Sequence, residues 1–135
     1  MDGRDRSRSP LPWSAFGADP ERTNREAERI DPGSDYSFYR GLLALRHGRE
    51  AFGTGSLRIL PTDDPSILLY VRESVDETYV IVVGMDEAAA RTGVAAAANL
   101  PGDPRRLLGD ATLVREGSSA RVTVPAAGMG VFRVR

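Results

Sequence analysis

Polar residues, prolines and glycines dominate residues 1–33, and apolar side chains recur there without any regular spacing. Proline interrupts helices and glycine loosens the backbone, so this pattern does not build a regular element. Its few large apolar groups cannot offset an ordering entropy of roughly 1–2 kcal/mol per residue. We therefore predict an irregular leader over residues 1–33.

A helical pattern begins after this leader. Ser34 can accept a hydrogen bond from a first-turn amide, and Asp35 suits the positive end of the helix dipole. Gly48 is suited to the left-handed conformation that ends many helices, and His47 just before it is interpreted as a helix-end residue without chemistry. The predicted helix and its connection cover residues 34–54. Three- and four-residue steps connect Tyr36, Tyr39, Leu42, Leu43 and Arg46, and Phe38 and Leu45 widen the apolar face.

From residue 55 onward the apolar period becomes two, which indicates strands. Val80–Val83 is apolar on both faces, so its strand should lie in the middle of a sheet. Closely spaced turn signals, such as residues 62–65, favour an antiparallel β-sandwich over residues 55–135. The fold class is therefore mainly β, with one preceding helix. The predicted strands are Leu57–Leu60, Ile67–Glu73, Thr78–Gly84, Gly93–Ala96, Arg106–Leu108, Thr112–Val114, Ala120–Val124 and Gly130–Val134.

Composition narrows the function. The chain has 135 residues and a net charge of −1, which disfavours a nucleic-acid partner. It has no cysteine and one histidine, so no metal site of the usual spacing is present and no cofactor is implied. No apolar run approaches the ~20 residues of a membrane span, and residues 1–12 lack the apolar core of a signal peptide. We therefore expect a cytoplasmic protein without a membrane partner.

Catalytic patterns are weak when the residues are taken alone. Asp63 and Asp64 are adjacent acids before a proline, a pattern typical of a turn. The arginines at 4, 6 and 8 form a small basic patch that is interrupted by acids, which favours a solvated or ion-paired face. These observations predict a soluble β-sandwich with a helix and a polar leader, and no reaction.

Residues 3–13, GRDRSRSPLPW, resemble the Gly-Arg-Asp-x-x-Arg-Thr-Pro-Met-Pro-Trp motif of alpha-glucosidases in the alpha-amylase superfamily, glycoside hydrolase family thirteen. Residues 26–34 resemble the approach to the last helix of that family's (β/α)₈ barrel, and residues 38–46 resemble that helix. Residues 64–72 and 125–135 resemble strands of its C-terminal sandwich. Residues 14–25 are shorter than the family's loop and lack its Pro-Trp-Leu-Pro turn.

The resemblance implies that the chain is the C-terminal part of a longer retaining glycoside hydrolase that acts on alpha-glucosidic bonds. Residues 1–33 would be the remnant of a barrel loop, 34–54 the last barrel helix, and 55–135 the sandwich. The catalytic carboxylates of such enzymes lie on barrel strands that this chain lacks, so no catalytic residue is assigned and the isolated chain should be inactive. Arg4 matches the motif arginine that reaches the glucose next to the scissile bond, and in the intact enzyme it would bind the alpha-glucoside.

Other interpretations stay open. The sandwich could be a stand-alone binding or assembly module, although Tyr70, Tyr79 and Phe132 lie in apolar strands and are expected in the core rather than in a sugar platform. The chain could also be the tail of a related transglycosylase such as a trehalose synthase. Without the missing barrel, the helix should either self-associate through residues 36–45 or recruit Trp13 and Phe16 over its apolar surface.

Overall fold

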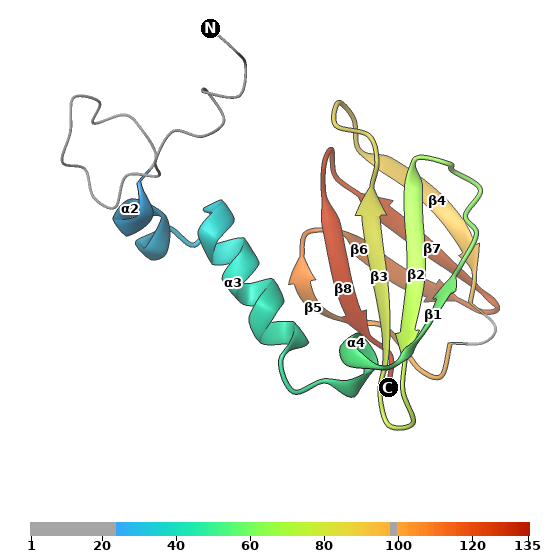
Figure 1. Ribbon diagram of the computed structural model, residues 1–135. Helices are drawn as coiled ribbons and strands as arrows, with labels where there is room; N and C mark the ends of the chain where they lie inside the picture. The colour runs from blue at the N-terminus through green and yellow to red at the C-terminus, as the bar shows by residue number, and fades with distance from the viewer. Residues whose placement is uncertain (1–23, 98–99) are drawn as a thin grey trace, which may run out of the picture. The chain divides into compact units, whose positions relative to one another are not determined.

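The computed structural model describes residues 24–97 and 100–135, and the chain divides into two compact units, residues 1–45 and 46–135 (Figure 1). Helix α2 (Arg25–Ile30) and helix α3 (Asp35–Arg46) make up the described part of the first unit. Helix α4 (Glu50–Gly53) and the eight strands found in the described residues belong to the second unit. No helix in the described ranges combines the length and the apolar character needed to cross a membrane.

The prediction of an irregular leader over residues 1–33 is wrong at residues 25–30, which form helix α2. Its start is capped by Asn24, whose Oδ1 accepts a hydrogen bond from the Ala27 amide at 3.0 Å. Two acidic residues in its first turn, Glu26 and Glu28, favour the positive end of the helix dipole. The helix has no buried residue, so apolar periodicity could not reveal it.

Helix α3 begins and ends as predicted. The Ser34 hydroxyl accepts a hydrogen bond from the Ser37 amide at 3.1 Å, and Gly48 has a φ of 73° beyond the last turn. No residue of α3 is fully buried, and Tyr39 and Leu43 are 60% and 64% exposed. The predicted helix is therefore confirmed, and much of its apolar surface faces solvent.

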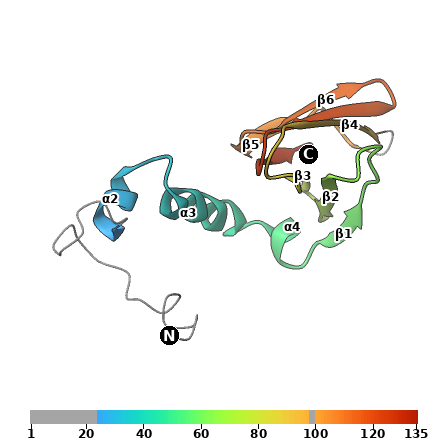
Figure 2. The ribbon, with the colours of Figure 1, turned by 90° about the horizontal axis from the view of Figure 1, so that it is seen from above.

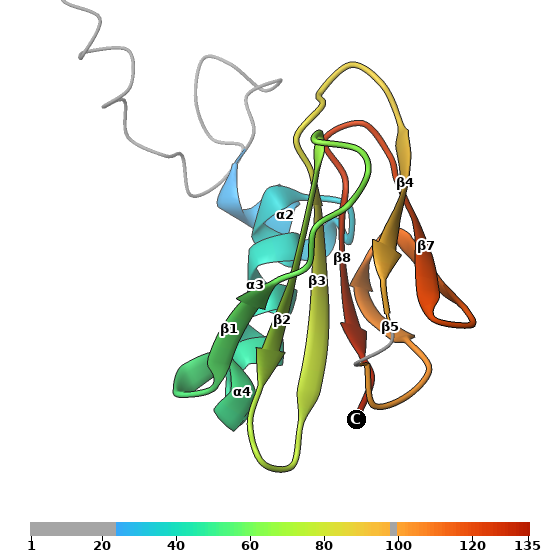
Figure 3. The ribbon, with the colours of Figure 1, turned by 90° about the vertical axis from the view of Figure 1, so that its right-hand side faces the viewer.

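The second unit is an antiparallel β-sandwich, and the predicted fold class is confirmed. One sheet has the order β1-β2-β3-β8-β5 and the other has the order β4-β7-β6. Figure 3 shows β1, β2, β3 and β8 side by side, with β4 and β7 in the other layer. All eight predicted strands are present, with bounds that shift by at most two residues. They are β1 (Ser56–Ile59), β2 (Ile67–Glu73), β3 (Thr78–Gly84), β4 (Arg91–Ala96), β5 (Arg105–Gly109), β6 (Thr112–Glu116), β7 (Ser119–Val124) and β8 (Met129–Arg133).

The core lies between the two sheets, which appear as separate layers in Figure 2. Strand β3 is central, as its apolar pattern predicted, and Val80 and Val82 are fully buried in this core. Alternate residues of β2, such as Leu69 and Val71, point to the same side as these valines, as the β2–β3 register requires. Phe132 of β8 completes the middle of the core.

Helix α4 lies over the other face of the five-stranded sheet and was not predicted. Arg72 of β2 donates from Nε to the Ala51 carbonyl at 2.9 Å. Ala51 is fully buried, and an added Cβ at Gly55 would lie 2.5 Å from the Ala51 carbonyl oxygen. The connection into β1 therefore requires a glycine at position 55, because any side chain would collide with the α4 backbone.

Candidate functional site

The one residue for which the sequence predicts substrate binding, Arg4, lies outside the residues that the structure describes. The rest of the motif at residues 3–13 and the aromatic residue Phe16 lie outside them as well. A substrate role of Arg4 therefore stays a prediction. The candidate site in the described chain is the segment that follows this region directly, from Asn24 through α3.

Two serine hydroxyls hold the turn between α2 and α3. Ser34 Oγ donates to the Glu28 carbonyl at 2.6 Å, and Ser37 Oγ donates to the Asp31 carbonyl at 2.7 Å. The Asp31 carboxylate accepts the Gly33 amide at 2.8 Å and closes the Asp-Pro-Gly turn. The end of α2 thus has its free carbonyls satisfied by the first turn of α3, and the two helices form one small folded unit.

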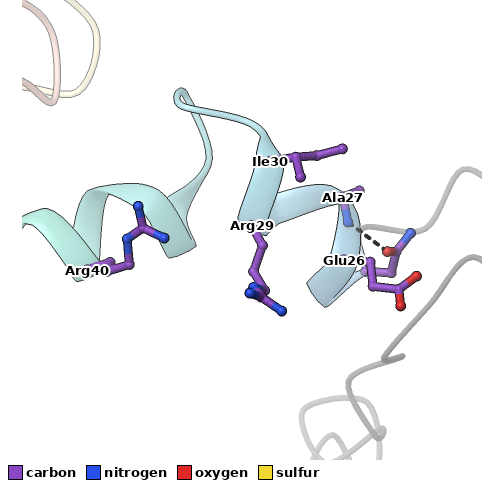
Figure 4. A pocket seen from close by; sticks show the side chains of 6 residues that line it. Glu26, Ala27, Arg29, Ile30 and Arg40 are labelled. Carbon is purple, nitrogen blue, oxygen red and sulfur yellow. Dashed lines mark hydrogen bonds between the residues drawn. The ribbon is translucent and has the colours of Figure 1, made fainter.

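A depression of about 560 Å³ lies beside these helices (Figure 4). Arg29 comes from α2 and Arg40 from α3, and neither guanidinium has a hydrogen bond or ion pair within the described residues. Among the lining residues that the structure describes, Glu26 is the only carboxylate, so these residues supply no pair of acids for glycoside chemistry. Its lining residues are Asn24, Glu26, Ala27, Arg29, Ile30 and Arg40.

Three carboxylates of the sandwich serve as structural acceptors. Asp63 Oδ1 accepts the Val94 amide at 2.6 Å, and Asp64 Oδ1 accepts the Ser66 amide at 2.8 Å, so the adjacent acids form a turn as predicted. Asp86 accepts the Ala88 and Ala89 amides and pairs with Arg91. In residues 24–97 and 100–135, no group of His, Cys, Asp or Glu is arranged to hold a metal ion.

The electrostatics of two acids of the sandwich, Asp86 and Glu116, do not suit the general acid of glycoside hydrolysis. Hydrogen bonds from the Ala88 amide and then from Arg91 lower the pKa of Asp86, and the hydrogen bond from Arg121 lowers the pKa of Glu116. A general acid in glycoside hydrolysis needs a raised carboxyl pKa so that it holds a proton at neutral pH. The pKa values of Asp86 and Glu116 are therefore shifted downward, whereas a general acid needs an upward shift.

Aromatic side chains do not form a sugar platform on the described sandwich. Tyr79 and Phe132 are 0% and 2% exposed, and Tyr70 is half-buried, where burial raises the pKa of its phenol. Tyr79 and Phe132 are both buried as predicted, Phe132 in the core between the sheets and Tyr79 on the opposite face of its sheet, against Phe52. His47 is exposed directly after α3, with no hydrogen bond or ion pair in the part of the chain that the structure describes.

No family model matches the chain, but curated proteins resemble it in part. It is 28% identical to the probable oligo-1,6-glucosidase 3 of Bacillus subtilis over 97 residues, which is 62% of this chain and 18% of the relative. It is 41% identical to the trehalose synthase of Thermus thermophilus over 63 residues, 46% of this chain and 6% of the relative. It is 34% identical to the alpha-glucosidase of Schizosaccharomyces pombe over 73 residues, 53% of this chain and 12% of the relative.

Solved structures share the fold. An alpha-amylase from H. orenii superposes with a TM-score of 0.71 at 17% identity and covers 95% of this chain and 28% of its own. An isomaltulose synthase from Klebsiella sp. LX3 superposes with a TM-score of 0.73 at 20% identity, and the match covers 98% of this chain and 26% of that enzyme. A trehalulose synthase superposes with a TM-score of 0.75 at 24% identity, and the match covers 97% of this chain and 26% of that enzyme.

The predicted resemblance to alpha-glucosidases of the alpha-amylase superfamily is confirmed, since the relatives include oligo-1,6-glucosidases and an alpha-glucosidase. The chain spans less than a fifth of the length of these relatives.

Proposed function

We propose that this chain is the C-terminal part of an alpha-glucosidase-like glycoside hydrolase whose complete form cleaves alpha-glucosidic bonds with retention. The observation that carries the proposal is the homology to oligo-1,6-glucosidases, which covers 62–63% of this chain but only 18% of each relative. A module of this size then supplies the end of the enzyme, and the larger remaining part supplies the chemistry. The expected cytoplasmic location belongs to the same proposal.

In this proposal the isolated chain is inactive. Retaining hydrolysis needs two carboxyl groups about 5–5.5 Å apart, one of them with a raised pKa. Asp63, Asp64 and Asp86 of the sandwich are held by backbone amides, and the lining residues described at α2 and α3 include a single carboxylate. The catalytic carboxylates are assigned to the missing barrel.

Each segment has a distinct role in the intact enzyme. Residues 1–33 form a barrel loop from which Arg4 binds the glucose next to the scissile bond, because a guanidinium can contact hydroxyls and a carboxylate together. Residues 34–54 hold the last barrel helix, and residues 55–135 form the sandwich. The exposed apolar side chains of α3, including Tyr39 and Leu43, support a barrel as the partner of this helix.

The two alternatives are less well supported. A stand-alone sugar-binding module would present exposed aromatic rings, and the large apolar groups that are exposed on the described sandwich are aliphatic or methionine side chains. The match to a trehalose synthase does not favour a transglycosylase tail over the hydrolase, because oligo-1,6-glucosidases match a longer part of the chain.

A chimera tests the proposal. The barrel of an oligo-1,6-glucosidase relative, cut before the residues that align with Gly3, is fused to residues 3–135 and assayed with a chromogenic alpha-glucoside. We expect turnover by the chimera and none by the isolated chain. In the chimera, Arg4→Ala should lower kcat/KM at least about tenfold, whereas the matched change Arg6→Ala should leave it within about twofold.

Three outcomes contradict parts of the proposal. A folded but inactive chimera would exclude this chain as the end of such an enzyme. Equal effects of Arg4→Ala and Arg6→Ala would remove the assignment of Arg4. Turnover by the isolated chain above a buffer blank, lost on mutation of one of its own acids, would place the catalytic site within these residues.

A further inference from the structure

Strand β1 forms an open edge of the five-stranded sheet. Within residues 24–97 and 100–135 it pairs with β2 alone, with Leu57 opposite Arg72 and Ile59 opposite Tyr70. All four of its residues are exposed. An exposed edge strand carries unpaired backbone donors and acceptors that can pair with another chain.

The register identifies which backbone groups face outward. The Leu60 amide donates to the Leu69 carbonyl at 2.9 Å, so these two residues form a hydrogen-bonded pair. Hydrogen-bonded and non-bonded pairs alternate along an antiparallel ladder, so Arg58 directs its amide and carbonyl toward β2. Leu57 and Ile59 therefore direct theirs toward the free edge.

The side chains of β1 add a specific pattern to this edge. Leu57 and Ile59 lie on one face and are 57% and 61% exposed. Arg58 lies on the other face, opposite Val71, and makes no ion pair or hydrogen bond within the described residues. An incoming strand would therefore meet an apolar, a basic and an apolar side chain in succession.

A second copy of this chain fits the edge poorly. The symmetric antiparallel pairing that places Leu57 opposite Ile59 also places Arg58 directly opposite Arg58. Like charges in directly opposed positions destabilise a strand pair. A shift by one residue would join the unlike faces of the two sheets. A shift by two residues would join like faces, but it would place Arg58 opposite Ser56 or Leu60 and so give it no acidic partner.

We propose that the β1 edge binds an extended segment of a partner polypeptide in which one acidic residue lies between two apolar residues. The acid pairs with Arg58, the apolar side chains pack on Leu57 and Ile59, and the segment's backbone bonds to the outward groups of these two residues. This inference uses only β1 and β2, so it is independent of the proposed enzymatic function.

The experiment uses the full chain, labelled with ¹⁵N, and the probe acetyl-Thr-Val-Glu-Val-Thr-amide. Antiparallel addition places the probe's glutamate opposite Arg58 and its valines opposite Leu57 and Ile59. We expect amide shifts centred on Leu57 and Ile59 at millimolar probe. The matched lysine probe should bind at least about threefold more weakly, and N-methylation of both valines should abolish the shifts because it removes the donors to the edge.

A charge reversal completes the test. Arg58→Glu should reverse the preference so that the lysine probe binds more tightly, with the rest of the spectrum unchanged as evidence of an intact fold. Arg58→Gln should bind both probes equally. The proposal is overturned by the absence of shifts at about 10 mM probe, by equal binding of the two probes to the wild type, or by shifts that persist after N-methylation.

Discussion

The ring of Phe52 stacks on the ring of Tyr79, with centroids 4.5 Å apart and planes inclined by 30°. This contact joins α4 to the face of the five-stranded sheet that points away from the core between the sheets. Tyr79 is fully buried, and its hydroxyl donates to Glu77 Oε1 at 2.9 Å. Burial, with that hydrogen bond, raises the pKa of the Tyr79 phenol. Phe52 therefore covers the beginning of β3 on the face that points away from the core between the sheets.

We predict that Phe52→Ala lowers the free energy of unfolding of the sandwich by about 2 kcal/mol, because a half-buried ring and a stacked contact are lost. Chemical denaturation followed by circular dichroism measures the change. Phe38→Ala is the matched control, since this ring lies in the other unit and is 36% exposed. Equal losses for the two variants would show that the stack does not stabilise the sandwich specifically.

Gly55 and Gly53 form a second matched pair. A Cβ at Gly55 would lie 2.5 Å from the Ala51 oxygen and 2.6 Å from the Glu73 oxygen, and both atoms belong to the backbone. We expect Gly55→Ala to lower the free energy of unfolding by about 2 kcal/mol or more. At Gly53 no atom lies within 4 Å of the added Cβ, so Gly53→Ala should leave stability unchanged or raise it by up to about 1 kcal/mol. A tolerated alanine at position 55 would refute the close approach of α4 and β2.

The pH dependence of stability should report on Asp86. Its pKa is lowered in the folded state, so its ionised form stabilises the protein above the pKa of the unfolded chain, and this stabilisation is lost as the pH falls toward the folded value. Asp86→Asn should therefore lower the melting temperature at pH 7, with a difference that narrows below about pH 4. Glu87→Gln removes a neighbouring carboxylate that makes no hydrogen bond in the described chain, and it should have little effect. A difference that stays constant from pH 7 to pH 3 would contradict this linkage.

Self-association of the isolated chain should depend on α3. Tyr39 and Leu43 expose most of their surface, and their double replacement by glutamine should yield a monomer where the wild type associates. Light scattering across a concentration series measures the change, with Arg40→Gln on the same helix as the control. A wild type that stays monomeric throughout the series would exclude this surface as a contact between copies.

Local sequence patterns determined the strands and the longest helix of this protein. The alternation along residues 67–73 predicted β2, and the continuous apolar run at residues 80–83 predicted the central position of β3. The spacing of apolar residues along a strand shows whether one or both of its faces are buried. Ser34 and Gly48 marked the ends of α3, because helix caps act through bonds and dihedral angles within a few residues. The resemblance to alpha-glucosidases also came from short motifs that can be read without a structure.

Only the tertiary structure decided how these elements combine. Helix α4 has four residues, too few for periodicity to indicate a helix, and it is stabilised where Phe52 meets Tyr79 and Arg72 meets Ala51. The division into sheets of five and three strands depends on pairing between residues distant in sequence, which a local period does not encode. Asp63, recognised in the sequence as a turn residue, gained a bond to Val94 of β4 in this way. The open edge at Arg58 likewise exists only because β1 is the last strand of its sheet.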